Sequence, residues 1–315
     1  TNVKKEELSN IDLLPRIRNK VLVTPELAPL FKAPKDVLLV NFSTLTRVLD
    51  GDGYTKDTGS QGRRGYSGDY KFVWIGATTP LANSVWNAMG NMGNRLFFLQ
   101  LKEKNRVEED YIKMFEGEDY EEKVKECRGA VKSFLDSFFL KYQIRSLKWD
   151  KSKDTEVLKK IIKYSQLLSK IRAGMMPFEE RQSGEIGFPL VEEPPRIINA
   201  FLNFARGHAL INGREHLTEE DLEFVRAVCF SSMPLDRQKF LNLLIKYKGR
   251  MTTEQIEKEL NCHNTTATRT MNLFETLGLV KIKGFYNDEG RGYGNPMNYV
   301  EIMPEFEEIL FGIQV

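Results

Sequence analysis

Cysteine is scarce in this chain, and the few cysteines are not arranged for metal binding or for redox chemistry. The 315 residues include three cysteines, Cys127, Cys229 and Cys262, and no two of them form a CxxC pair. Cys262 and His263 are adjacent, but two neighbouring residues cannot by themselves complete the four-ligand shell of a structural zinc ion. The spacing therefore predicts no metal site, and isolated thiols are typical of a reducing compartment.

Long apolar runs and a strong charge of one sign are also missing. No stretch approaches the roughly 18 apolar residues that a membrane-spanning helix needs, and no secretory leader is recognisable. The formal net charge is +2, with 29% charged and 41% hydrophobic residues, which is ordinary for a globular protein. We therefore expect a cytoplasmic protein without a membrane partner, and 315 residues suffice for two or three domains.

Short apolar segments alternate with helical patterns in the first third of the chain. Strands are expected at 20–24, 71–77 and 95–101, a helix at 36–49, and a Gly-rich hairpin at 54–69. The run at 71–77, KFVWIGA, is almost continuously apolar, as in a strand buried inside a parallel sheet. Strands that alternate with helices predict an α/β architecture for this part.

The remainder of the chain is predicted to be largely helical. Residues 104–175 are charged with a helical period, and two further helices are expected at 195–212 and 218–231. Thr218 is a typical N-cap residue, with Asp221 three positions on, in the place of the usual Glu or Gln of a capping box.

After Pro234 the pattern changes again. Helices are expected at 235–247, 252–260 and 264–277, followed by two strands at 279–283 and 297–302. A helix, a helix-turn-helix and a two-stranded wing, in this order, predict a winged helix.

The ordered motifs of roughly residues 20–230 resemble the second half of an AAA+ ATPase core and its lid. VLVTPE (21–26) is similar to a Walker B strand, VWIGATTP (73–80) to sensor 1, and GNRLFF (93–98) to the arginine-finger segment. The hairpin at 54–69 stands where the family has the hairpin that precedes sensor 1. The stretch at 194–222, PPRIINAFLNFARGHALINGREHLTEEDL, resembles the lid of the MoxR and minichromosome-maintenance branches.

This resemblance implies roles at a bound nucleotide. Glu26 would be the general base, and Thr79 (together with Thr78) would hold the attacking water. Arg196 would act from the lid of the same subunit, and Arg95 would reach the nucleotide of a neighbouring subunit. An arginine offered across an interface implies a ring or another oligomer.

Each of these four residues also has a plainer interpretation. Glu26 fits the acidic first turn of a helix, and Thr79 before Pro80 fits a common strand end. Arg95 fits a surface ion pair. Arg196 fits a helix cap or a partner of Glu192.

Three departures from the family pattern limit the activity expected of this chain. Pro25 stands where the family has an Asp that helps to hold Mg²⁺, and Thr79 replaces the common Asn of sensor 1. No GxxxxGK[ST] phosphate loop occurs anywhere in the sequence. We therefore expect ATP and Mg²⁺ as cofactors only of a longer protein, of which this chain is the C-terminal portion, and no ATPase activity of the chain alone.

Two basic segments are candidate DNA contacts. Lys56, Arg63 and Arg64 lie near the tip of the expected hairpin, which faces the central pore in ring motors of the resembled family, and phosphates would suit these cations. A solvated basic loop is the alternative.

The second segment is the expected recognition helix. NTTATRTMNLFETLGLV (264–280) resembles the recognition helix of MarR- and ArsR-like regulators, and such a helix fits the major groove. The predicted contacts in the groove and at the wing are Thr265, Thr266, Thr268, Arg269, Arg291 and Tyr293. Residues 235–302 carry ten basic and eight acidic residues, a net +2, which is a weak charge for a DNA-binding module, and docking of a protein is the alternative.

The sequence thus predicts a partial AAA+ α/β core (1–103), a helical lid (104–232), a winged helix (233–303) and an acidic tail (304–315). The function that we expect is ATP-driven work on DNA, as a helicase, translocase or loader in the replication of a chromosome or mobile element. The alternatives are a MoxR-like protein-remodelling ATPase, and a transcription regulator with an inactive ATPase-like platform.

Overall fold

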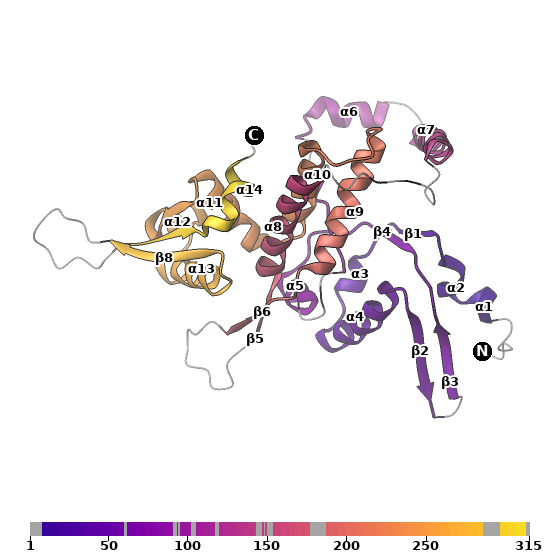
Figure 1. Cartoon of the computed structure of the whole chain (residues 1–315), viewed down its shortest axis with the longest axis horizontal. Helices are drawn as coiled ribbons and strands as arrows, with labels where there is room; N and C mark the ends of the chain where they lie inside the picture. Colours follow the sequence, from indigo (N-terminus) through magenta and orange to yellow (C-terminus); the bar gives the residue numbers. More distant parts are fainter. Residues whose placement is uncertain are drawn as a thin grey trace, which may run out of the picture.

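The computed structural model describes residues 8–59, 62–90, 93, 95–101, 105–116, 120–142, 147, 149, 154–176, 187–285 and 297–312. In these ranges the chain is a mixed α/β protein in which helices predominate and each sheet has two or three strands. Figure 1 shows a central helical bundle with the N-terminal α/β part on one side and the C-terminal helices on the other. No helix in these ranges is both long enough and apolar enough to cross a membrane.

A small parallel sheet organises the N-terminal part. Strand β1 (Val21–Thr24) pairs with β4 (Val73–Gly76), with Val21 opposite Val73. Helices α1 (Leu8–Ile11) and α2 (Leu13–Ile17) precede β1. Between β1 and β4 the chain forms helices α3 (Ala28–Phe31) and α4 (Lys35–Leu49) and the hairpin of β2 (Gly53–Thr58) and β3 (Gly62–Ser67). Helix α5 (Asn83–Gly90) follows β4. Helices α4 and α5 share a small core around Phe42 and Trp86.

The apolar strand predicted at 71–77 is shorter than expected and is not buried. The side chains of Val73 and Ile75 are 57% and 56% exposed, and Val21 and Val23 of β1 are 56% and 64% exposed. A parallel sheet normally has both faces covered. The expected environment inside a larger sheet is therefore not present in the described part of the chain.

The prediction of a strand at 95–101 is wrong, because this described segment does not pair with any strand. Its backbone groups bond to side chains instead: the Phe98 N–H donates to the hydroxyl of Ser232 (2.8 Å), and the Leu96 carbonyl accepts from Arg172 (2.9 Å). The Phe97 ring packs beside Phe201, at 5.7 Å between ring centroids. The segment thereby joins the N-terminal part to the helical bundle.

The central bundle consists of α8 (Thr155–Arg172), α9 (Pro195–Ile211) and α10 (Glu219–Ser231), with the short hairpin of β5 (Gly174–Met176) and β6 (Phe188–Leu190) beside it. Asp221 accepts a hydrogen bond from the Thr218 N–H at 2.8 Å, which confirms the expected capping interaction at the start of α10.

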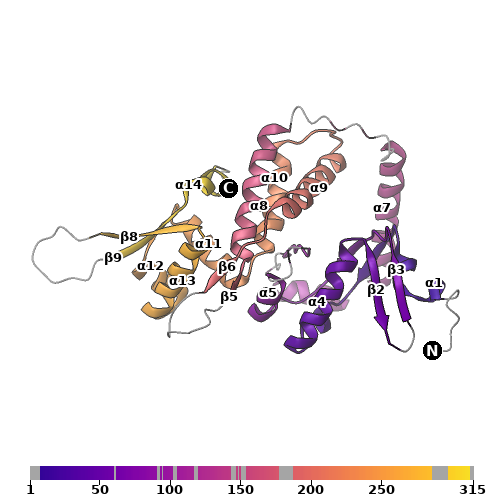
Figure 2. The ribbon, with the colours of Figure 1, turned by 60° about the horizontal axis from the view of Figure 1, so that its bottom comes forward.

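Two other helices precede the bundle, α6 (Glu108–Glu116) and α7 (Tyr120–Lys141). No residue of α7 is buried. Both views show α7 standing apart from α8–α10 (Figures 1 and 2). Helix α7 is therefore not packed into the bundle.

The C-terminal unit has the expected order of helices and one strand more than expected. Its elements are α11 (Leu235–Lys246), β7 (Arg250–Thr252), α12 (Thr253–Leu260), α13 (Asn264–Thr276), β8 (Val280–Phe285) and β9 (Met297–Ile302). The sheet order is β7-β9-β8, so β9 is the central strand. Thr252 caps α12, and Asn261 in the left-handed conformation (φ 48°) turns the chain toward α13.

The residues expected to form an acidic tail instead form α14 (Pro304–Phe311) for most of their length. Phe306, Ile309 and Leu310 are buried, and the Tyr164 hydroxyl on α8 donates to the Ile309 carbonyl at 2.9 Å. One continuous hydrophobic core extends from Val157 to Leu310. The bundle and the C-terminal unit, which we expected to be separate domains, therefore share a core.

Candidate functional site

Glu26 and Thr79 lie at the same edge of the parallel sheet, because each follows the carboxyl end of a strand. The Leu27 N–H donates to the Ala77 carbonyl at 2.7 Å, which holds the two loops together. The carboxylate of Glu26 accepts from the Ala28 N–H at 2.6 Å, at the first turn of α3. This contact matches the plainer interpretation of Glu26, and Thr79 is exposed at the same edge.

Arg95 is held within its own chain. Its guanidinium makes two hydrogen bonds to the carboxylate of Asp50, at 2.9 and 2.7 Å, and its side chain is only 14% exposed. The hydrogen bond from Arg95 and the nearby charge of Arg196 keep the pKa of Asp50 below its ordinary value. In this conformation Arg95 forms an intrachain ion pair, which matches its plainer interpretation.

Arg196 reaches the same place from the start of α9. It forms an ion pair with Glu192, four residues earlier, as the second interpretation of the sequence proposed. Gly93 (φ +83°) lies between the two arginines: a Cβ atom at this position would be 2.8 Å from Nη1 of Arg95 and 3.0 Å from Nη1 of Arg196. The structure thus gathers Arg95 and Arg196 around one glycine, with the carboxylates of Asp50 and Glu192.

Sequence analysis did not single out Arg172, at the end of α8, which lies next to this cluster. It is 3% exposed, and its guanidinium lies 5.2 Å from the centre of the Trp86 ring. Burial lowers the pKa of Arg172 to about 10, and the nearby charge of Glu192 opposes this shift. No sequence signal marks it, because a basic residue in the last turn of a helix is ordinary and its contacts come from segments distant in sequence.

The hairpin of β2 and β3 projects from the N-terminal part and carries the expected basic residues (Figure 1). Lys56 is directly opposite Arg64, and Asp57 is opposite Arg63. All three basic side chains are exposed. Like charges directly opposite one another destabilise an antiparallel pair, so the pairing of Lys56 with Arg64 favours binding of an anion at this face.

Helix α13 places one side in the core and the other in solvent. Ala267, Met271 and Phe274 are buried. Thr265, Thr266 and Arg269 are exposed, and Thr268 is partly exposed. The expected wing residues Arg291 and Tyr293 lie outside the described residues.

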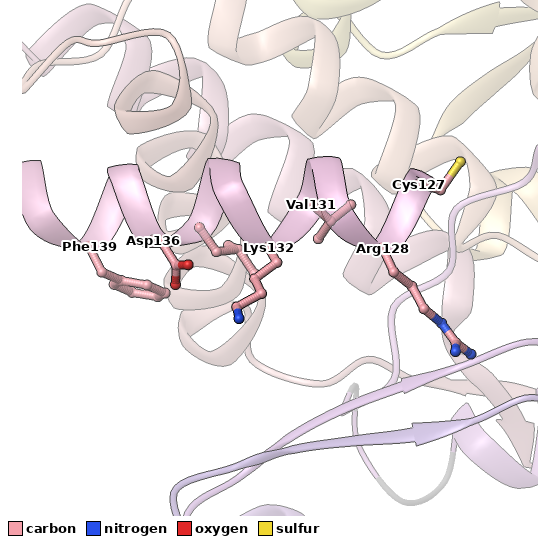
Figure 3. A pocket seen from close by; sticks show the side chains of 7 residues that line it. Cys127, Arg128, Val131, Lys132, Asp136 and Phe139 are labelled. Atoms are coloured by element: carbon pink, nitrogen blue, oxygen red, sulfur yellow. The ribbon is translucent and has the colours of Figure 1, made fainter. Parts of the chain in front are cut away.

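One face of α7, between Cys127 and Phe139, is open to solvent and lies away from the other candidate residues. Figure 3 shows the side chains of Cys127, Val131 and Phe139 along it. Val131 and Phe139 are 57% and 53% exposed. Helix α7 therefore offers an apolar surface that the described part of the chain leaves uncovered.

No protein-family model matches the chain, and no curated protein is similar to it at a significant level.

Proposed function

We propose that this chain is the DNA-binding part of an ATP-driven motor of the AAA+ type. The observation that carries the proposal is the exposed polar side of α13. Thr265, Thr266 and Arg269 are exposed near its N-terminal end, while Met271 and Phe274 anchor its other side. A helix held in this way and followed by a β-ribbon supports assignment as a winged-helix reader of the major groove.

The hairpin of β2 and β3 supports a second contact with nucleic acid. Lys56 and Arg64 are exposed and directly opposite each other. A bound phosphate would relieve their repulsion, and contacts with the backbone require no particular sequence. The combination of a groove-reading helix and a phosphate-binding hairpin suits a protein that moves along DNA.

The described residues do not by themselves form a nucleotide site. Pro25 offers no side-chain oxygen for Mg²⁺, no phosphate loop is present in the sequence, and the carboxylate of Glu26 already accepts from the Ala28 N–H. The exposed apolar strands β1 and β4 support a larger sheet in the complete motor. In that assembly Arg95 would serve as an arginine finger only after it left Asp50.

The proposal is tested by the affinity of the chain for duplex and single-stranded DNA over a range of salt concentrations. Replacing Arg269 by alanine should weaken binding, and if Arg269 contacts a phosphate it should reduce the slope of log K against log salt by about one unit. Loss of affinity confined to particular duplex sequences would instead indicate that Arg269 reads a base. Lys239→Ala removes an exposed charge from α11 and serves as the matched control.

A chain that fails to bind any DNA at low salt would contradict the proposal. The second candidate, a protein-remodelling ATPase, is favoured by the exposed apolar side chains on one face of α7, among them Val131 and Phe139. It predicts that Phe139→Glu abolishes capture of a protein partner and that Arg269→Ala has no effect. Tight binding to a single duplex sequence, without any response of the complete protein to ATP, would favour a transcription regulator.

A further inference from the structure

One face of the hairpin of β2 and β3 carries tyrosines near its base and cations nearer its tip. Tyr54 is directly opposite Tyr66, and Lys56 is directly opposite Arg64. Side chains two residues apart on a strand point to the same face of a sheet. The two tyrosines and the two cations therefore share one face of the hairpin, which we call the tyrosine face.

Two arginines from outside the hairpin extend the tyrosine face. Helix α4 lies beside β2 (Figures 1 and 2), and the guanidinium carbon of its Arg47 lies 5.5 Å from the centre of the Tyr54 ring. The Tyr66 ring lies 5.7 Å from the Tyr70 ring, and the guanidinium carbon of Arg18 lies 5.4 Å from the centre of the Tyr70 ring. A cation within about 6 Å of an aromatic ring is attracted to the face of that ring. The three partly exposed rings therefore form a row with an arginine at each end.

The positive charges of this face are not neutralised within the described part of the chain. Its exposed cations are Arg18, Arg47, Lys56 and Arg64. None of the four forms an ion pair with a residue that the structure describes, and the Asp12 carboxylate at this face accepts instead from the Tyr66 hydroxyl at 2.8 Å. By contrast, every lysine of α8 is paired with a carboxylate. Unpaired cations beside a row of aromatic rings favour a ligand that brings both negative charge and flat rings.

We propose that the tyrosine face binds a single strand of DNA, with phosphates at Lys56 and Arg64 and bases against the row of rings and its two arginines. Proteins that bind single strands combine cations that contact the backbone with aromatic side chains on which bases stack. A duplex buries the faces of its bases, so it can offer this surface its phosphates but cannot stack on the rings. That the ligand is DNA rests on the proposed function, whereas the preference for a single strand follows from the tyrosine row.

The proposal also divides the basic residues of the hairpin into two groups. Arg63 is directly opposite Asp57 and alternates with Arg64 along β3, so it belongs to the other face of the hairpin. Lys56 and Arg64 should therefore contribute more to binding of a single strand than Arg63 does. A solvated basic loop without a defined ligand would show no such difference.

Fluorescence anisotropy of a labelled oligothymidylate and of a labelled duplex, measured over a range of salt concentrations, tests the proposal. Tyr54→Leu keeps an apolar side chain but removes the ring, and it should weaken binding of the single strand about fivefold or more. Lys56→Gln should reduce the slope of log K against log salt for the single strand by about 0.7. Arg63→Gln removes the same charge from the other face and should change this slope less, and Lys239→Ala on α11 is the control for both measurements.

Photo-crosslinking of the wild-type chain to a single strand that contains iododeoxyuridine needs no variant, so it does not depend on how a substitution affects folding. Mass spectrometry should locate the crosslinks at Tyr54, Tyr66 or Tyr70. Crosslinks confined to other parts of the chain, or none at all, would overturn the proposal. So would a Tyr54→Leu variant that binds the single strand as tightly as the wild type.

These outcomes separate the tyrosine face from the proposed role of α13. Weaker duplex binding by Arg269→Ala, together with unchanged single-strand binding by Tyr54→Leu, would refute the tyrosine face and leave the proposed function standing. Binding of the single strand that depends on Tyr54, in a chain that does not bind duplex, would support the tyrosine face and contradict the assignment of α13 as a groove reader.

Discussion

The buried carboxylate of Asp221 should be one of the most sensitive single sites for the stability of the helical bundle. Its side chain is fully buried and accepts hydrogen bonds from Nη1 of Arg214 at 2.7 Å and from the Thr218 N–H at 2.8 Å. Nδ1 of His208 lies 2.7 Å from the other carboxylate oxygen, Oδ1. Removing one partner of a buried ion pair costs about 3–5 kcal/mol. Because the side chains of Arg214 and His208 are 19% and 34% exposed, water can compensate part of this loss. We expect Asp221→Asn to lower the free energy of unfolding by about 2–3 kcal/mol at pH 7.

The pH dependence gives this prediction a second readout. Burial alone would raise the pKa of Asp221, but hydrogen bonds from Arg214, His208 and the Thr218 N–H outweigh burial and keep the pKa below its ordinary value of 3.8. A carboxylate with a lowered pKa stabilises the folded state above its unfolded pKa, and this stabilisation is lost as the pH falls through its folded pKa. The difference in the free energy of unfolding between wild type and Asp221→Asn should therefore be constant above about pH 5 and should become smaller below about pH 4.

Urea unfolding followed by circular dichroism measures both effects. Glu220→Gln is the matched control, because Glu220 contacts the same arginine at 3.2 Å but is 76% exposed. This control should change the free energy of unfolding by at most about 0.5 kcal/mol. The reasoning would be refuted if Asp221→Asn were no less stable than Glu220→Gln. It would also be refuted if the difference in the free energy of unfolding between wild type and Asp221→Asn were the same at pH 2.5 as at pH 7.

Three other perturbations test the packing described above. Phe306→Ala should lower the free energy of unfolding by about 3–5 kcal/mol, because the ring is 1% exposed, whereas the same change at exposed Glu307 should have little effect in a urea titration. The thiol of Cys229 is buried and burial raises its pKa, so a thiol reagent followed by mass spectrometry should modify exposed Cys127 in the folded protein and Cys229 only in urea. Gly93→Ala should destabilise by at least about 1 kcal/mol, because φ is +83° and a Cβ would approach the arginines; a variant with unchanged Tm would contradict the described packing.

Helices whose patterns are local were predicted from the sequence. Those at 195–212 and 218–231 correspond to α9 (Pro195–Ile211) and α10 (Glu219–Ser231). Their apolar spacing, the proline at the start of one and the Thr218 cap of the other lie within each segment. A capped amphipathic helix contains most of its own determinants.

Features that depend on distant partners were not predicted. The segment 95–101 has the composition of a strand, but a strand needs a neighbour, and its carbonyls and amides bond to Arg172 and Ser232 instead. Residues 304–315 were predicted to be an acidic tail because of their acidic side chains. The i, i+3, i+4 spacing of Phe306, Ile309 and Leu310 is nevertheless typical of a buried helix face. The three-residue strand β7 (Arg250–Thr252) is too short to leave a pattern.

The candidate site was predicted only in part. The resemblance assigned Glu26 and Thr79 to one bound nucleotide, and in the structure both follow strands that end at the same edge of the sheet. That Arg95 pairs with Asp50, 45 residues earlier, is not visible in the sequence. Arg172 was missed because its burial is created by Trp86 and Leu96, and no local pattern at the end of α8 indicates these neighbours.

The docking of α14 on α8 has a consequence for synthesis of the protein. The Tyr164 hydroxyl finds its acceptor, the Ile309 carbonyl, 145 residues later in the chain. At about 5–20 residues per second, a ribosome needs roughly 7–30 s to cover that distance. Throughout this interval α14 does not yet shield its side of α8 from water. The nascent chain should therefore be a substrate for chaperones that bind exposed apolar helices.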